Sequence, residues 1–196
     1  MPLAPALVAL LCLLPAPAGS GTAPASAPAG KVFLTQEEAL KLAFPDCVIE
    51  RRTVFLDEED RKRAAELAGK GVDVDRRVVY LYEARRADKV VGTAYFDAHR
   101  VRTMDEVLMF VVDGEARIQR LEMLSFGEPE EYIPRGKWYA QFEGKALSDD
   151  LRLKGAIKGV SGATLTATAT ADAARRTLAL HAVIAAKPRR AAPLGR

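Results

Sequence analysis

The sequence predicts a single α+β domain in which a central antiparallel sheet of hairpins is flanked by N-terminal helices and a long C-terminal helix. Three observations lead to this fold class. Strand-like segments in the middle of the chain fall into pairs joined by short polar turns, as β-hairpins do. Helix signals precede these segments, and a long Ala-rich segment follows them. The part of the chain that carries charge, from residue 31 onward, has the length of one domain.

The first 30 residues predict export. They contain no charged side chain, and an apolar run over 6–14 is followed by Pro15 and by Ala16-Pro17-Ala18, an Ala-x-Ala cleavage pattern. This arrangement is typical of a secretory signal peptide, and the run is shorter than the roughly 20 apolar residues that span a bilayer. We therefore expect a signal peptide and flexible linker over 1–30, and a periplasmic location or one on the outer face of the membrane.

Two helices and a strand are expected first in the folded part. Thr35-Gln-Glu-Glu38 has the spacing of a capping box and predicts a helix that Pro45 ends. The apolar segment 47–56 predicts a strand. The acidic run 57–60 opens a second helix, as the helix dipole favours, and Gly69 ends it.

Two hairpins are expected next. The first joins strands over 77–85 and 89–97 through a short polar turn. The second joins strands over 107–112 and 116–125, with Asp113-Gly114 as its turn signal.

The remaining segments complete the domain, which we place over 31–186. A Pro-rich loop leads to a short helix over 137–142, where we expect Trp138 to lie in the core. The Ala-rich segment 163–186 is interpreted as a helix, although the alternation of Thr and Ala near its start also has the period of a strand.

The charge of the domain is balanced. The chain has a formal net charge of +3, but four of its 29 Lys and Arg side chains lie in the last ten residues, so 31–186 carry 25 basic and 26 acidic groups. We therefore predict a basic disordered tail over 187–196 and no nucleic-acid partner. Once the leader is removed, Cys47 is the one cysteine left, so neither an internal disulfide nor a thiolate metal site is expected.

The common catalytic motifs are missing from the sequence. It contains no GxSxG, no GxxxxGK[ST], no GxGxxG after a strand and no HExxH. The two histidines, His99 and His181, are far apart without metal-ligand spacing. Hydrolases, nucleoside triphosphatases and zinc enzymes are therefore disfavoured.

One segment, 159–166, combines glycine and hydroxyl groups just before the predicted C-terminal helix. The first amides of a helix are unpaired and lie at the positive end of its dipole, so they can bind phosphate. Lys158 would add positive charge. Spacing alone favours a simpler interpretation, in which Ser161 caps the helix and Thr164 and Thr166 make local contacts.

A resemblance to a known family favours the interpretation of this segment as a phosphate site. Ser161-Gly162-Ala163-Thr164-Leu165-Thr166 resembles the SGATLT signature of the FMN-binding domain family. That family includes the covalent-flavin subunits of the sodium-pumping NADH:quinone oxidoreductase and of the Rnf electron-transport complex. Glu128-Pro129 and the segment WYAQFEGK over 138–145 are similar to the sequence preceding the signature there. The resemblance covers about 78–180.

The resemblance implies that a flavin transferase joins FMN through its phosphate to Thr164. Gly162 would allow close approach of the backbone, and Ser161 and Thr166 would hydrogen-bond the phosphate. The family usually has Asp three residues before the Ser of the signature, where this chain has Lys158. This lysine would either impair the attachment or pair with the phosphate of FMN held without a covalent bond.

A basic segment after the expected strand 89–97 is a second candidate contact. His99 and Arg100 would reach the flavin ring or its phosphate, or they form a solvated turn. The residues predicted to bind the cofactor are Lys158, Ser161, Gly162, Ala163, Thr164, Leu165, Thr166, His99 and Arg100.

The sequence thus predicts an exported FMN-carrying electron-transfer domain that works with redox protein partners at the membrane. A redox carrier is favoured over a stand-alone oxidoreductase. One alternative is a periplasmic flavin-dependent reductase with non-covalent FMN. The other is a binding or scaffold domain without flavin, for which Lys158 is the main support.

Overall fold

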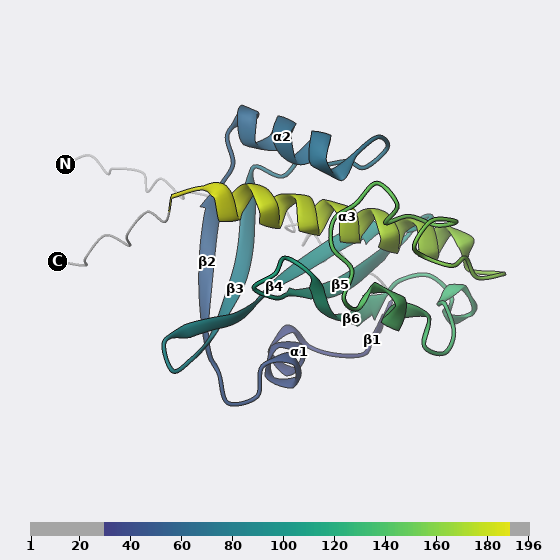
Figure 1. Ribbon diagram of the computed structural model, residues 1–196. Coiled ribbons are helices and arrows are strands. Elements are labelled where there is room, and N and C mark those ends of the chain that lie inside the picture. Colours follow the sequence, from purple (N-terminus) through teal and green to yellow (C-terminus); the bar gives the residue numbers. More distant parts are fainter. Residues whose placement is uncertain (1–29, 189–196) are drawn as a thin grey trace, which may run out of the picture.

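The computed structural model describes residues 30–188, which form a six-stranded antiparallel sheet with helices on both faces (Figure 1). The strand order is β1-β6-β5-β4-β3-β2. The strands are β1 (Lys31–Val32), β2 (Val48–Phe55), β3 (Val78–Arg86), β4 (Lys89–Arg100), β5 (Asp105–Val112) and β6 (Ile118–Phe126). The helices are α1 (Gln36–Ala43), α2 (Glu58–Ala68) and α3 (Thr164–Ala186), with short 3-10 helices η1 (Glu130–Tyr132) and η2 (Trp138–Phe142). The predicted α+β fold class is confirmed.

The ends of the chain carry predictions that the structure does not reach. The expected signal peptide and all but the first two residues of the expected basic tail lie outside the described residues. Within residues 30–188, no helix is long and apolar enough to cross a membrane.

Local capping fixes the ends of the two N-terminal helices, as predicted. The Thr35 hydroxyl accepts a hydrogen bond from the Glu38 amide at 3.2 Å, and the Glu38 carboxylate accepts one from the Thr35 amide at 2.8 Å. Asp57 and Asp60 form the same reciprocal pair at the start of α2. Gly69 ends α2 with a φ of 83°, a conformation that disfavours residues with a Cβ.

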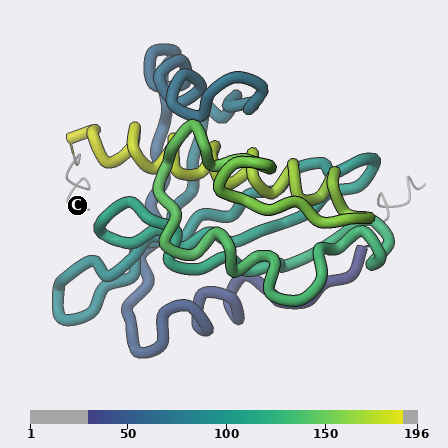
Figure 2. Tube along the Cα trace, turned by 45° about the vertical axis from the view of Figure 1, so that its right-hand side comes forward, coloured from purple at the N-terminus to yellow at the C-terminus, as the bar shows by residue number. Residues whose placement is uncertain are grey.

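The sheet separates two apolar cores. The larger one lies between the sheet and the helices α2 and α3, and it includes Trp138 and Phe142 of η2. The smaller one lies under α1, where Leu40 and Phe44 pack on β3, β4 and β5. Trp138 is buried in the larger core, so its predicted place there is confirmed. Figure 2 shows the long connection between β6 and α3, in green, lying beside the first half of α3.

Both predicted hairpins form, with differences at their turns. The β3–β4 turn is made by Ala87 and Asp88, whose φ values are both positive. In the β5–β6 turn, the Asp113 carboxylate accepts hydrogen bonds from two amides of the loop, and the left-handed residue is Ala116. Asp113-Gly114 therefore marks the turn through its aspartate, because the side chain binds the loop backbone.

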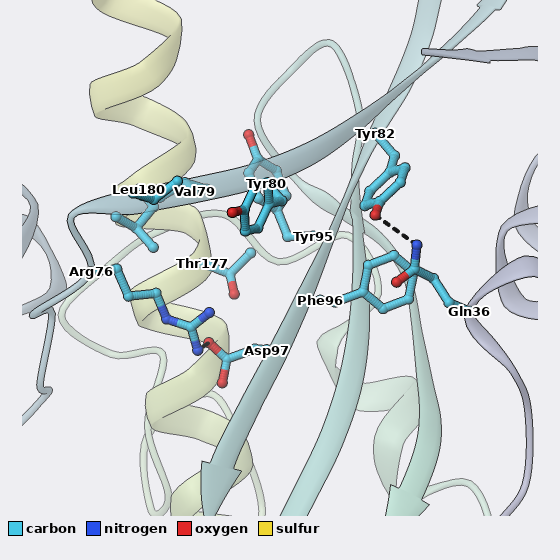
Figure 3. Close-up of a pocket in the computed structure, with 11 residues that line it drawn as sticks. Gln36, Arg76, Val79, Tyr80, Tyr82, Tyr95, Phe96, Asp97, Thr177 and Leu180 are labelled. Atoms are coloured by element: carbon cyan, nitrogen blue, oxygen red, sulfur yellow. Dashed lines mark hydrogen bonds and ion pairs between the residues drawn. The ribbon is translucent and has the colours of Figure 1, made fainter. Parts of the chain in front are cut away.

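Strands β3 and β4 diverge toward one end of the sheet. Their pairing runs from the turn to Leu81 and Tyr95, and beyond that point Val78–Tyr80 pair with β2 alone. A cavity of about 130 Å³ lies between the separated strands and α3 (Figure 3). The Arg76 guanidinium closes part of this gap, because it donates to the Ala98 carbonyl at 3.3 Å and to the Asp97 carboxylate at 3.0 Å.

The contact between α1 and the sheet predicts a steric effect at Gly92. A Cβ at this position would lie 2.9 Å from Phe44 Cε1 and 3.5 Å from Val111 Cγ1. We expect Gly92→Ala to lower the free energy of unfolding by about 1–3 kcal/mol, measured by urea denaturation, because the closely packed core must shift. Gly114→Ala is the control, since no atom lies within 4 Å of its added methyl group. Equal stabilities of the two variants would contradict the packing described.

Candidate functional site

A pocket of about 210 Å³ lies at the start of α3. Three separate parts of the chain form it: the β4–β5 hairpin tip, η1 and the segment that enters the helix. The lining residues are Arg102, Tyr132, Gly162, Ala163, Thr164, Leu165 and Thr166. Five of the nine residues predicted to bind the cofactor are therefore in its wall.

The first turn of α3 lacks a side-chain cap. Its N-cap residue is Ala163, and within residues 30–188 no side chain caps the amides of the turn. The interpretation of Ser161 as the N-cap is wrong, because the helix begins two residues later than that role requires; Ser161 lies exposed in the loop. Gly162 has a φ of 85°, which a residue with a Cβ adopts only at a cost. The helix thus presents uncapped N–H groups beside the pocket.

The two threonines of the signature have different environments. Thr164 is exposed, and its hydroxyl lies 3.4 Å from the Val160 carbonyl. Thr166 is 1% exposed, and its hydroxyl donates to the Tyr132 carbonyl at 2.6 Å. Thr164 is therefore accessible for chemistry, whereas Thr166 ties η1 to the helix.

Arg102 brings positive charge to the pocket. It lies at the tip of the β4–β5 hairpin, which the hydrogen bond from the Val101 amide to the Met104 carbonyl closes at 3.0 Å. Its guanidinium carbon is 5.0 Å from the centre of the Tyr132 ring. Among residues 30–188, no acidic side chain forms an ion pair with Arg102. The guanidinium is thus available to bind an anion.

Lys158 and Arg100 lie away from the pocket wall. The backbone of Lys158 is fixed, because its carbonyl accepts from Trp138 Nε1 at 2.7 Å and its amide donates to the Gln141 side chain at 2.9 Å. The Lys158 side chain is exposed. Arg100 is 71% exposed and lies 3.8 Å from Asp105.

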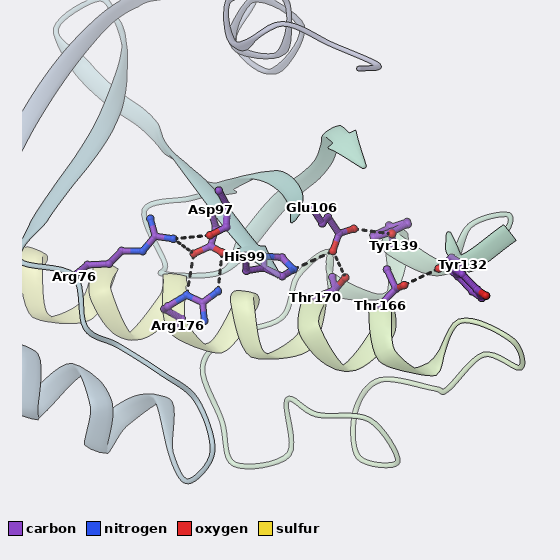
Figure 4. A network of polar contacts seen from close by, with 10 residues as sticks. Arg76, Asp97, His99, Glu106, Tyr132, Tyr139, Thr166, Thr170 and Arg176 are labelled. Carbon is purple, nitrogen blue, oxygen red and sulfur yellow. Dashed lines mark hydrogen bonds and ion pairs between the residues drawn. The ribbon is translucent and has the colours of Figure 1, made fainter. Parts of the chain in front are cut away.

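His99 is part of a buried polar network under α3, outside the pocket (Figure 4). Its Nδ1 lies 3.0 Å from Asp97, and its Nε2 lies 3.0 Å from Glu106, directly across the β4–β5 pair. Because successive residues of a strand point to opposite faces, Asp97 and His99 both face α3, whereas Arg100 faces away. The expectation that His99 follows the strand is wrong, since β4 continues to Arg100.

The network joins the sheet to α3 and to η2. Arg176 of α3 donates two hydrogen bonds to Asp97, at 2.7 and 2.9 Å, and Arg76 donates a third. The fully buried Glu106 carboxylate accepts from the Tyr139 hydroxyl at 3.1 Å and from the Thr170 hydroxyl at 3.3 Å. These contacts fix the first half of α3 relative to the strands.

Charges inside the network shift the pKa values of its members. Burial opposes the ionisation of Asp97, but hydrogen bonds from His99 and Arg176 and the charge of the arginines outweigh it, so the pKa of Asp97 falls to about 2. Burial also opposes the protonation of His99. The hydrogen bonds to Asp97 and Glu106 and their charges prevail, so the pKa of His99 rises to about 9. The ring is therefore cationic at neutral pH.

Sequence reasoning missed several residues that shape the site. Asp97, Glu106 and Arg176 are charged residues on strand and helix faces that point inward, and period-two alternation in β4 was the one signal that placed Asp97 with Tyr95 on a core face. Arg102 belongs to the basic segment 99–103, from which sequence reasoning selected only His99 and Arg100. Tyr132 was interpreted as part of a surface loop, although the resemblance placed that loop near the cofactor.

No protein-family model and no curated protein matches the chain. Within residues 30–188, no group of three or more His, Cys, Asp and Glu side chains is arranged to hold a metal ion.

The His99 network predicts a pH-dependent stability. Because the pKa of His99 is near 6.5 in the unfolded chain and about 9 in the folded one, the stabilisation is complete below pH 6.5 and lost as the pH rises through 9. We expect wild type to lose on the order of 3 kcal/mol of unfolding free energy over this range, measured by urea denaturation. His99→Gln should be less stable than wild type at pH 6, and its unfolding free energy should change little between pH 6.5 and 9.

An NMR titration of the His99 ring in wild type provides an independent check that needs no variant. We expect the ring to remain protonated above pH 8. A midpoint near 6.5 would contradict the network.

Proposed function

We propose that this chain is an FMN-carrying electron-transfer domain whose cofactor phosphate binds at the first turn of α3. One observation supports the proposal above the others: the uncapped start of a 23-residue helix faces a pocket that an unpaired arginine lines. Uncapped amides, the helix dipole and a guanidinium are the groups that bind phosphate in proteins. The resemblance of 161–166 to the SGATLT signature supports a flavin as the owner of the phosphate.

The residues of the pocket fit the phosphate end of FMN. The amides of Thr164–Thr166 and the Arg102 guanidinium would hold the phosphate, and Gly162 leaves room for close approach because it has no Cβ. Ligand pockets usually have volumes of roughly 300–1,000 Å³, and this one has about 210 Å³. The flavin ring would therefore extend beyond the pocket, over the exposed side chain of Leu165. When bound, the flavin supplies the electron chemistry, and the protein sets its position and exposure.

Thr164 would be the point of covalent attachment. Its exposed hydroxyl lies at the pocket wall, on the first residue of the helix. In the attachment the Oγ1–H bond breaks and an Oγ1–P bond forms, while a flavin transferase delivers the flavin phosphoryl group from an activated donor whose leaving group departs with the proton. The threonine would be an anchor without a redox role.

The openness of the site favours a carrier over a reductase. Leu165 is 56% exposed beside the pocket, and Thr164 is exposed as well. A reductase encloses a substrate next to its flavin, whereas a carrier must offer the flavin edge to protein partners. Redox partners at the membrane, and the export that the leader predicts, belong to this proposal.

Lys158, which stands where the family usually has Asp, bears on whether the flavin is bound covalently or non-covalently. Its exposed side chain lies outside the pocket wall. A reductase with non-covalent FMN and a flavin-free scaffold are the competing functions.

Covalent attachment predicts a mass change that depends on Thr164. The full chain, made in cells that possess the flavin transferase and then denatured, should gain the mass of FMN minus one water. Thr164→Val should lack this increment, because it has no hydroxyl. Thr168→Val is the matched control, since Thr168 is an exposed threonine one turn further along α3.

Flavin released on denaturation would indicate non-covalent binding. Colourless protein from such cells would overturn the FMN assignment.

Phosphate binding by Arg102 predicts a difference between two neighbouring arginines. We expect Arg102→Gln to weaken the binding of added FMN roughly tenfold or more, measured by quenching of flavin fluorescence, because a hydrogen bond between charged groups contributes about 1.5–3 kcal/mol. Arg100→Gln should leave the affinity within twofold, since Arg100 is exposed outside the pocket. Equal effects would indicate general attraction between FMN and a basic surface.

A further inference from the structure

Glu128 is the residue that holds the hairpin tip carrying Arg102. One oxygen of its carboxylate, Oε1, accepts hydrogen bonds from the Thr103 amide at 2.6 Å and from the Met104 amide at 2.8 Å. The same oxygen lies 3.2 Å from the Thr103 hydroxyl. The Glu128 side chain is 8% exposed, and its contacts with the tip are partly buried.

The amides that surround Glu128 behave as an anion-binding nest. Hydrogen bonds from the Thr103 and Met104 amides lower the pKa of the Glu128 carboxyl, with a smaller contribution from the Thr103 hydroxyl. Successive backbone amides in a turn bind anions in this way. The amides of the hairpin tip are therefore already occupied by the Glu128 carboxylate, which lies in the connection between β6 and η1.

Close contact between the two segments depends on Gly127. A Cβ at Gly127 would lie 2.7 Å from Met104 Cβ and 3.0 Å from the Asp105 carbonyl. The Gly127 amide donates to that carbonyl at 2.8 Å, which places the next residue, Glu128, against the tip.

These contacts have a consequence for the Arg102 side chain. Glu128 binds the backbone of the tip and does not pair with the Arg102 guanidinium. The guanidinium lies over the Tyr132 ring. The carboxylate thus fixes the position of Arg102 without neutralising its charge. The four-residue tip 101–104 would move without this anchor, as exposed hairpin tips do.

We propose that Glu128 is a positioning residue: it holds the β4–β5 tip so that Arg102 faces the phosphate site at the start of α3. This inference rests on the proposed function, because it concerns how the FMN phosphate is bound. It assigns to Glu128 a role in ligand affinity that acts through Arg102.

The test compares substitutions at Glu128 in the full chain, made in a host without flavin transferase and titrated with FMN. Glu128→Ala should weaken FMN binding at least fivefold, because the tip loses its anchor. Glu128→Gln should stay within twofold of wild type, since its amide oxygen can accept the same hydrogen bonds. Glu130→Ala is the control from the same connection, because Glu130 pairs with Lys31 and does not touch the tip.

A double-variant cycle separates positioning from a general loss of structure. If Glu128 acts through Arg102, Glu128→Ala should cost nothing further in the Arg102→Gln background. Amide hydrogen exchange at Thr103 and Met104 should accelerate in Glu128→Ala and remain slow in Glu128→Gln. Thermal unfolding of each variant checks that the domain stays folded at the titration temperature.

Each outcome bears on the proposal. Additive losses in the double variant, or wild-type affinity in Glu128→Ala, would overturn the role of Glu128 and leave FMN binding in place. Absence of FMN binding by the wild-type protein would overturn the proposed function together with this inference.

Discussion

The Asp97 carboxylate is the contact through which the sheet fixes helix α3. A buried carboxylate is unfavourable unless charged partners and hydrogen bonds surround it. Here Arg176 arrives from the helix, Arg76 from the segment before β3, and His99 from the same strand. Rotation or sliding of the helix would therefore break both hydrogen bonds from Arg176 and separate its buried guanidinium from Asp97. Since Thr164 lies three turns before Arg176 on the same helix, the position of the pocket wall follows from this cluster.

Stability and specificity have different sources in this fold. The two apolar cores on either side of the sheet supply the main driving force for folding, through buried surface. Buried ionic groups contribute little net stability, but they penalise alternative arrangements strongly. The chain of contacts from Asp97 through His99 and Glu106 to Tyr139 therefore selects one placement of α3 and η2 on the sheet. The site at the start of α3 depends on that placement.

Sequence patterns predicted those parts of the structure that are encoded within a few neighbouring residues. The capping box at Thr35, the stop at Gly69 and the contiguous segment 161–166 are of this kind. The remaining contacts of the site could not be predicted, because Arg102 and Tyr132 meet α3, and Glu128 meets the β4–β5 tip, only after the register of β4, β5 and β6 is set. His99 was misplaced for a related reason: inward-facing polar residues in β4 and β5 pair with one another, so the polar stretch after Asp97 looks like a loop although the strand continues.

Because β3 diverges from β4, one end of the sheet consists of two parts: the pair β2–β3 and the four strands β1-β6-β5-β4. They share a backbone ladder of six residue pairs, from Arg86–Lys89 to Leu81–Tyr95. Beyond it, the Arg76 guanidinium joins the segment before β3 to Asp97 and Ala98 of β4. Salt and acid leave the hydrogen bonds of a backbone ladder in place. An ion pair is weakened by salt, which screens its charges, and by acid, which protonates its carboxylate. Because the pKa of Asp97 is about 2, this bridge should be lost only as the pH falls through that value, and the two parts of the sheet should then separate first at the far end.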